Sequence, residues 1–338
     1  MLAIFTTVMI RTYLAVLQKE SKIMNLYPAD PNYNNSKGVS FSTGFFMLLG
    51  FALLGIILSS FLSLGIVMAT TGGSITEMEN ALKDPANANL LRMIQVGSVV
   101  LSMFLPALIV AGIMNKKPFR LLGFKKEITI QQIGFTILIV LVSIFIAGSL
   151  AILNKEIADV LGWRGWSEKL EKSYNEQVAV MLNLDSIWGY LISLFVMAFI
   201  PALCEEMLFR GGLQNFLSRA TNKPWVAIII VSILFSIVHF SVYGFLVRLF
   251  LGVVLGLIFH YTKSIWLCIA AHFFNNALAV SSIYFFMNQG TNMEEAMKKD
   301  VPAAYWGFLA VPLLFLLFRS LKKTLGEPLT QTHQQHGI

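Results

Sequence analysis

The chain has 338 residues, of which 56% are hydrophobic and only 13% are charged. Soluble domains carry about 25% charged residues, so this composition excludes a disordered chain and argues against a soluble enzyme. It indicates a protein whose apolar residues face a lipid bilayer. The net charge of +7 fits a membrane-orientation signal better than nucleic-acid binding, and we expect no nucleic-acid partner. Two cysteines are too few for a disulfide framework or a zinc-ribbon site.

Eight apolar segments are candidates for membrane-spanning helices, each of which needs about 20 residues. The sequence contains no alternating pattern of the kind that forms membrane β-barrels. It therefore predicts an all-α fold, a polytopic membrane helix bundle of about eight transmembrane helices. In chain order, the predicted spans cover residues 45–69, 93–114, 133–153, 187–209, 225–241, 243–261, 264–288 and 301–318.

We expect a single transmembrane domain over residues 45–318, with a polar or interfacial lead-in over 1–44 and a cytoplasmic tail over 319–338. The apolar run Met1–Leu17 is too short to span a bilayer, which favours an interfacial helix. Met24 is an alternative start of the chain.

Basic and acidic residues are distributed unevenly between the connections. One set of connections contains 12 basic and 2 acidic residues, and the other contains 8 basic and 12 acidic residues. The sets alternate along the chain, and basic connections stay in the cytoplasm. We therefore expect both termini on the cytoplasmic side of a multi-pass protein, which we place in a bacterial cytoplasmic membrane. The basic set covers 115–132, 210–224, Lys263 and the tail after 318, and the acidic set covers 70–92, 154–186 and 289–300.

Several polar residues lie inside the predicted spans, where charges cost several kcal/mol and usually serve a function. These residues are Glu205, Glu206, Arg248, His239 and His272. We expect Arg248 to snorkel outward or pair locally rather than to take part in chemistry. Glu205, His239 and His272, together with Asn276, predict a shared polar cavity, because polar groups in lipid turn toward each other or toward water.

The fourth span carries two adjacent acids with different surroundings. Glu206 and Arg210 are four residues apart, so they share a helix face and can neutralise each other. Glu205 is rotated by about 100° from that face and lacks a partner in its own turn. An unpaired carboxylate in an apolar setting suits a general base.

Two further spans carry polar residues at a spacing of four. Phe235 and His239 share one face, so the aromatic ring can shield the imidazole. His272 and Asn276 share another face, and both can donate hydrogen bonds to an oxyanion. For Glu205 to reach the depth of the histidines, we expect the fourth helix to continue through residues 211–217.

Together these motifs resemble those of a known family. Glu205-Glu206-x-x-x-Arg210, Phe235-x-x-x-His239 and His272-x-x-x-Asn276 occur in order on separate hydrophobic segments. They look like the three motifs of the CAAX prenyl protease and bacteriocin-processing family of intramembrane proteases, also called the CPBP or Abi family. The resemblance covers about residues 187–288, the expected protease core, which also contain the close-packing pattern Gly252-x-x-x-Gly256.

The resemblance implies an intramembrane glutamate endopeptidase that needs neither a metal nor a cofactor. Glu205 with His239 would activate water, and His272 with Asn276 would stabilise the oxyanion. Phe235, Glu206 and Arg210 would hold the site in shape. The implied partners are membrane lipids and a peptide or membrane-protein substrate, whereas the cleavage specificity and the oligomeric state stay open.

Two other functions are compatible with the same residues. A zinc protease could use a carboxylate and two histidines as ligands, although the sequence contains no H-E-x-x-H motif. A non-enzymatic transporter or scaffold could use an intramembrane cluster of Glu and His as a proton relay. The sequence contains no repeat of broken helices of the kind found in transporters, which argues against the transporter.

Overall fold

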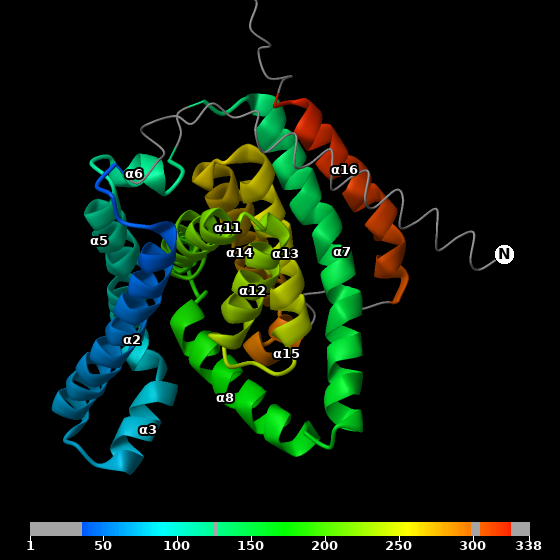
Figure 1. The fold of residues 1–338 in the computed structure, drawn as a ribbon. Coiled ribbons are helices and arrows are strands. Elements are labelled where there is room, and N and C mark those ends of the chain that lie inside the picture. The colour runs from blue at the N-terminus through cyan, green and yellow to red at the C-terminus, as the bar shows by residue number, and fades with distance from the viewer. Residues whose placement is uncertain (1–35, 125–126, 299–304, 326–338) are drawn as a thin grey trace, which may run out of the picture.

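The computed structural model of the protein describes residues 36–124, 127–298 and 305–325. This part of the chain is helical and contains no strand, which confirms the predicted all-α fold (Figure 1). Seven of its helices are long and apolar enough to cross a membrane, and the predicted fifth span corresponds to a shorter apolar helix, Pro224–Ile237. The seven are Phe41–Thr71, Pro85–Met114, Ile130–Val160, Ile187–Thr221, Phe245–Thr262, Ile265–Asn288 and Tyr305–Lys323.

Some of these long helices are divided into consecutive elements, because 3₁₀ and π turns interrupt the α-helical pattern. The first half of the chain contains α2 (Phe41–Thr71), α3 (Ile75–Lys83), η1 (Pro85–Asn87), α4 (Ala88–Val99), η2 (Val100–Phe104), α5 (Leu105–Met114), α6 (Pro118–Leu121), α7 (Ile130–Val160) and α8 (Arg164–Leu182). The second half contains α9 (Ile187–Ser193), η3 (Leu194–Phe199), α10 (Ile200–Glu206), η4 (Met207–Gln214), α11 (Asn215–Thr221), α12 (Pro224–Ile237), α13 (Phe245–Thr262), α14 (Ile265–Asn288), α15 (Met293–Lys298), η5 (Tyr305–Ala310) and α16 (Val311–Lys323).

The helices form two packed groups with the fourth span between them. In Figure 1, α2 and α5 lie on one side, α11–α14 occupy the centre, and α7 packs against α16 on the other side. One buried core joins α2 and α5 to η4, and a second joins α7, α13, α14 and α16. The fourth span contributes Phe209 to the first core and Ala202 to the second, so it links the two groups.

Capping residues explain why the first and third spans are longer than predicted. The Ser40 side chain accepts a hydrogen bond from the amide of Thr43 and starts α2 ahead of its apolar stretch. Thr129 and Gln132 form a capping box at the start of α7. These polar residues lie outside the hydrophobic windows, so hydropathy alone places the helix ends too far inward.

The fourth span runs without a break from Ile187 to Thr221, which confirms the expected continuation through residues 211–217. Its predicted end at residue 209 is therefore wrong. The helix ends where Asn222 adopts a left-handed conformation with φ of 55°. Arg210 lies fully buried inside this helix, so its assignment to a basic connection is also wrong.

A second correction concerns Arg92, which was assigned to an acidic connection. Arg92 is buried in α4, where its guanidinium donates hydrogen bonds to the carbonyls of Met181 and Leu182 and to the hydroxyl of Ser193. The two carbonyls belong to the last turn of α8, so Arg92 satisfies acceptors that the helix end leaves unpaired.

The predicted fifth span, 225–241, ends earlier than expected. Helix α12 stops at Ile237 because the chain turns at Phe240, which has a φ of 48°. His239 therefore lies in the short connection between α12 and α13 rather than inside a helix.

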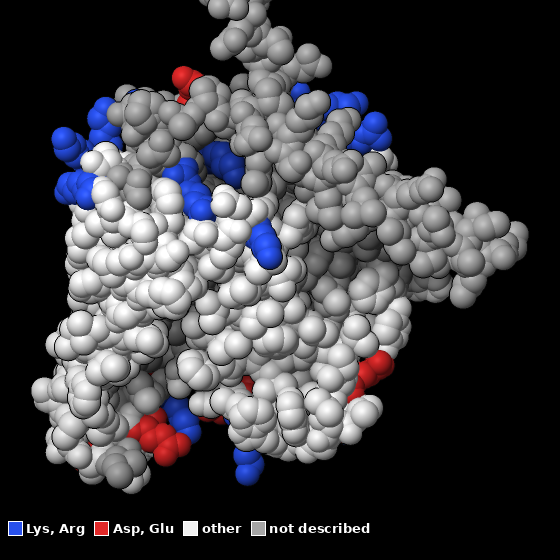
Figure 2. Space-filling view, viewed as in Figure 1, with Lys and Arg blue, Asp and Glu red and all other residues white. Residues whose placement is uncertain are grey.

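Charged side chains gather at the two ends of the molecule. Figure 2 shows Lys and Arg mainly at the end that carries α6 and the last turn of α16, and most Asp and Glu at the opposite end, with uncharged residues between them. This distribution supports a multi-pass membrane protein. The expectations for the interfacial run before residue 36 and for the tail after residue 325 lie outside the described residues.

Candidate active site

Three side chains from separate segments meet between the two cores. Glu205 lies on α10, His239 follows α12, and His272 lies on α14. The Nε2 atoms of both histidines lie 3.9 Å from Oε2 of Glu205. Glu205 is only 8% exposed. The structure thus brings together the three residues that the sequence placed in one cavity.

The ring of His239 is oriented by its own backbone. Its Nδ1 lies 2.7 Å from the carbonyl oxygen of Phe235, and a carbonyl can only accept a hydrogen bond. The Nδ1 proton is therefore donated to Phe235, and Nε2 faces Glu205 as the free ring nitrogen. The Phe235 ring packs against the imidazole, with 5.0 Å between the ring centroids.

Glu206 connects Arg210 to His272. Its Oε1 accepts a hydrogen bond from Nη1 of Arg210 at 3.0 Å and lies 2.8 Å from Nδ1 of His272. Both Glu206 and Arg210 are fully buried. The sequence predicted the Glu206–Arg210 pair but not the contact with His272, because no spacing rule relates residues on different helices. Glu206 thereby fixes the His272 ring with Nε2 turned toward Glu205.

The Gly252-x-x-x-Gly256 pattern has a second role besides close packing. Nη2 of Arg210 donates to the Gly252 carbonyl at 3.3 Å, and Gln214 donates to the Gly256 carbonyl at 2.9 Å. Arg210 and Gln214 are four residues apart, as are Gly252 and Gly256, so the two hydrogen bonds join successive turns of the two helices. A Cβ on Gly256 would lie 2.9 Å from Oε1 of Gln214 and 3.0 Å from the Ile228 side chain, so a larger residue there would have to displace both.

Phe235 and Asn276 differ in how closely they join this cluster. The Phe235 ring contacts both imidazoles and lies 4.5 Å below the guanidinium carbon of Arg210. Asn276 lies one turn beyond His272 on α14, and its side chain accepts a hydrogen bond from Asn275 at 3.2 Å. No hydrogen bond in the described part of the chain joins Asn276 to Glu205 or to either histidine.

The connection that carries His239 is held from outside by α7 and α8. The Asn154 side chain donates to the Val242 carbonyl and accepts from the amide of Leu246 at 3.0 Å. The Ser241 hydroxyl donates to Glu171 of α8 at 2.9 Å. Neither Asn154 nor Glu171 was predicted as a site residue, because Asn154 directly follows the predicted span 133–153 and Glu171 lies in a predicted connection.

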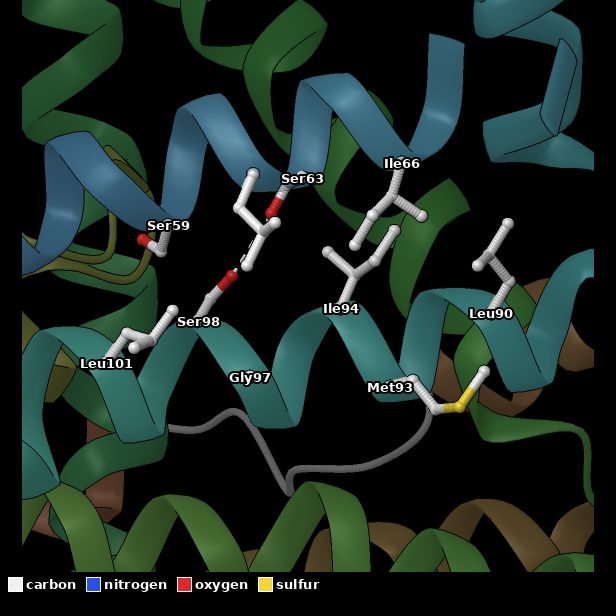
Figure 3. A pocket seen from close by; sticks show the side chains of 10 residues that line it. Ser59, Ser63, Ile66, Leu90, Met93, Ile94, Gly97, Ser98 and Leu101 are labelled. Atoms are coloured by element: carbon white, nitrogen blue, oxygen red, sulfur yellow. Dashed lines mark hydrogen bonds between the residues drawn. The ribbon is translucent and has the colours of Figure 1, made fainter. Parts of the chain in front are cut away.

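Within the described residues, no group of three or more His, Cys, Asp and Glu side chains is arranged to hold a metal ion. The site is also separate from a cavity of about 200 Å³ between α2 and α4 (Figure 3). That cavity is apolar apart from serines such as Ser63 and Ser98, which are joined by a hydrogen bond of 3.4 Å.

Comparison with known proteins identifies the region around this site. Residues 187–278 match the family model described as Rce1-like, type II CAAX prenyl endopeptidase. Neither the search of curated proteins nor the search of solved structures found a match. The matched region is about a quarter of the chain and contains all seven predicted site residues, from Glu205 to Asn276. It confirms the resemblance inferred from the three motifs: residues 187–278 are similar to the Rce1-like family of type II CAAX prenyl endopeptidases.

Proposed function

We propose that this protein is a membrane-embedded endopeptidase in which Glu205 and His239 activate water. The Rce1-like match supports an intramembrane protease of the CAAX type. The observation that carries the mechanism is the approach of two imidazole Nε2 atoms to one carboxylate oxygen of Glu205, each at 3.9 Å. That distance is too long for a direct hydrogen bond, and it suits groups that are bridged by one water molecule.

The proposed water is bound by two acceptors. Since Nδ1 of His239 carries the proton, Nε2 accepts one water proton and Glu205 Oε2 accepts the other. The lone pairs of the water oxygen then point away from both groups, toward a substrate carbonyl. As the oxygen attacks that carbon, Glu205 takes the proton, and the C–N bond breaks when the proton passes to the leaving nitrogen.

His272 and Asn276 are the proposed oxyanion donors. In this role His272 acts in its doubly protonated form, with Nδ1–H held by Glu206 and Nε2–H directed into the site. Asn276 would turn its amide toward the oxyanion when substrate binds. Glu206, Arg210 and Phe235 would keep the two rings in place, because all three contact a catalytic histidine or its partner.

The proposed substrate is a peptide or protein segment held at the membrane. A CAAX-type substrate carries a prenylated cysteine near its C-terminus, and the buried site would receive such a tail from the bilayer. We further propose that the reaction needs no metal ion or other cofactor. We also propose a location in a bacterial cytoplasmic membrane with both termini in the cytoplasm, an orientation that the excess of basic residues in one set of connections supports.

Proteolysis in liposomes tests this proposal. The purified protein is reconstituted with a farnesylated peptide that ends in a CAAX sequence, and products are identified by mass spectrometry. We expect cleavage by the wild-type protein and none by His239→Ala at equal protein load. Cleavage by both proteins would contradict the role of His239. Cleavage by neither, across prenylated and unprenylated peptides, would contradict the proposed hydrolysis and favour a non-enzymatic scaffold.

A further inference from the structure

Arg248 is a cation without a counter-charge beside the proposed active site. It lies in the first turn of α13, and its guanidinium carbon is 5.6 Å from the centre of the Tyr174 ring on α8. Its Nη1 atom is buried and makes no hydrogen bond within the described part of the chain, nor does any described carboxylate form an ion pair with it. The residue as a whole is only half-buried. Its contact with the Tyr174 ring is a local pairing of the kind expected from the sequence, although no described carboxylate takes part in it.

The position of Arg248 is fixed relative to the catalytic cluster by α13. Gly252, four residues on, lies on the same face about 6 Å further along the helix axis. The Gly252 carbonyl accepts from Arg210, the partner of Glu206. On the other side, His239 lies in the connection that leads into α13, and the charge of Arg248 acts on it electrostatically. Arg248 is thus one helical turn from Gly252, and its guanidinium lies over Gly244 and Tyr174 at the start of α13.

The absence of a side chain at Gly244 leaves space for the guanidinium of Arg248. The amide of Arg248 donates to the Gly244 carbonyl at 2.9 Å, and a Cβ on Gly244 would collide with the guanidinium of Arg248. Gly244 has a φ of −89°, which any residue adopts, so the absent side chain matters for space and not for backbone conformation. The start of α13 adds the positive end of a helix dipole to the same place.

We propose that Arg248 binds the C-terminal carboxylate of the peptide substrate, an inference that rests on the proposed function. A guanidinium presents a planar pair of N–H donors that matches a carboxylate. In a CAAX tail, three residues follow the prenylated cysteine, so the terminal carboxylate lies at most about 10 Å beyond it in an extended peptide. Arg248 begins the helix that follows His239 and is close enough for its charge to act on that ring, so a carboxylate about 10 Å beyond a bond cleaved at His239 can reach the guanidinium.

A binding measurement separates this inference from the proposed hydrolysis. Two fluorescent farnesylated peptides of the same CAAX sequence, one with a free C-terminal carboxylate and one with a C-terminal amide, are titrated against the protein in nanodiscs. The protein carries Glu205→Gln so that neither peptide is cut. We expect the carboxylate peptide to bind about 10–100-fold more tightly, the usual contribution of a charge-assisted hydrogen bond.

Three variants in that background locate the preference. Arg248→Gln should bring the ratio of the two Kd values to about one, and Gly244→Ala should reduce it by displacing the guanidinium while its charge is retained. Arg219→Gln is the matched control, since Arg219 also lies over an aromatic ring, that of Phe41, at 4.8 Å. It should leave the ratio unchanged, and thermal unfolding checks that each variant is folded.

The outcomes are distinct. Equal affinities for the two peptides, or a preference that survives both Arg248→Gln and Gly244→Ala, would overturn the assignment even if wild-type protein cleaves the peptide. A preference that Arg248→Gln abolishes would support the carboxylate site. If the wild-type protein then failed to cleave either peptide, the proposed hydrolysis alone would be refuted.

Discussion

Replacing Arg210 by alanine would leave a buried carboxylate without its principal counter-charge. Arg210 and Glu206 are both fully buried, and their side chains are joined at 3.0 Å. The substitution also removes the hydrogen bond to the Gly252 carbonyl and the contact of the guanidinium with the Phe235 ring. Glu206 would keep only His272 as a partner.

The size of the effect follows from this burial. Removing one partner of a buried ion pair costs about 3–5 kcal/mol, so the melting temperature should fall by about 5–15 °C for a chain of this size. Glu206→Gln should have an effect of similar size, because it leaves the Arg210 cation buried. The double variant Glu206→Gln/Arg210→Ala should lose less than the sum of the single changes, since no uncompensated charge then remains.

Thermal unfolding in detergent measures these differences, with activity recorded on the same samples. The matched control is Glu79→Gln, which breaks the pair of Lys83 and Glu79 and keeps the contact of Lys83 with Glu176. That pair has the same spacing of four residues and the same distance of 3.0 Å, but both side chains are more than half exposed. The control should leave the melting temperature unchanged within error. Equal melting temperatures for Arg210→Ala, the control and the wild-type protein would refute the idea that the buried pair holds the site together.

Three further predictions concern the mechanism and the topology. His272→Ala and Asn276→Ala should each lower kcat by about 10²–10³-fold, as expected for oxyanion donors, and full activity of either variant in the liposome assay would remove that residue from the mechanism. Prolonged dialysis against EDTA should leave cleavage intact, because a carboxylate and an imidazole suffice to activate water; a loss of activity that zinc alone restores would favour the metalloprotease. In a Cys204→Ser/Cys268→Ser background, an impermeant thiol reagent should label single cysteines at one set of positions from the cytoplasmic side and at the other set from outside, and the reverse pattern would overturn the proposed orientation. The first set is Lys117, Ala220 and Thr324, and the second set is Asn80, Leu170 and Glu295.

The helix bundle was predictable because lipid imposes length and hydropathy on every span. The ends of the helices were less so, since they depend on polar caps such as Ser40 and Thr129 that lie outside the apolar windows. Arg92 and Arg210 were assigned to connections because their partners are distant in sequence. Their burial depends on carbonyl and carboxylate groups that only the folded chain brings close.

The residues of the candidate site could be predicted from their spacing on single helices. Pairs four residues apart, such as Glu206 with Arg210, follow from helix geometry alone. Contacts between helices do not, and the link from Glu206 to His272 and the clamp of Asn154 on the connection after His239 emerged only from the structure. The surroundings of Arg248 belong to the same class, because only the packing shows that its Nη1 atom has no hydrogen-bond partner among the described residues.

The most direct test of the mechanism is the cleavage rate of Glu205→Gln in liposomes under saturating peptide. The amide cannot take a proton from water. General-base catalysis typically contributes about 10²–10⁴-fold, so kcat should fall by about 100-fold or more. The melting temperature should stay close to that of the wild-type protein, because Oε2 of Glu205 makes no hydrogen bond within the described residues. A folded Glu205→Gln protein that cleaves the peptide at a near-normal rate would contradict the central role of this carboxylate.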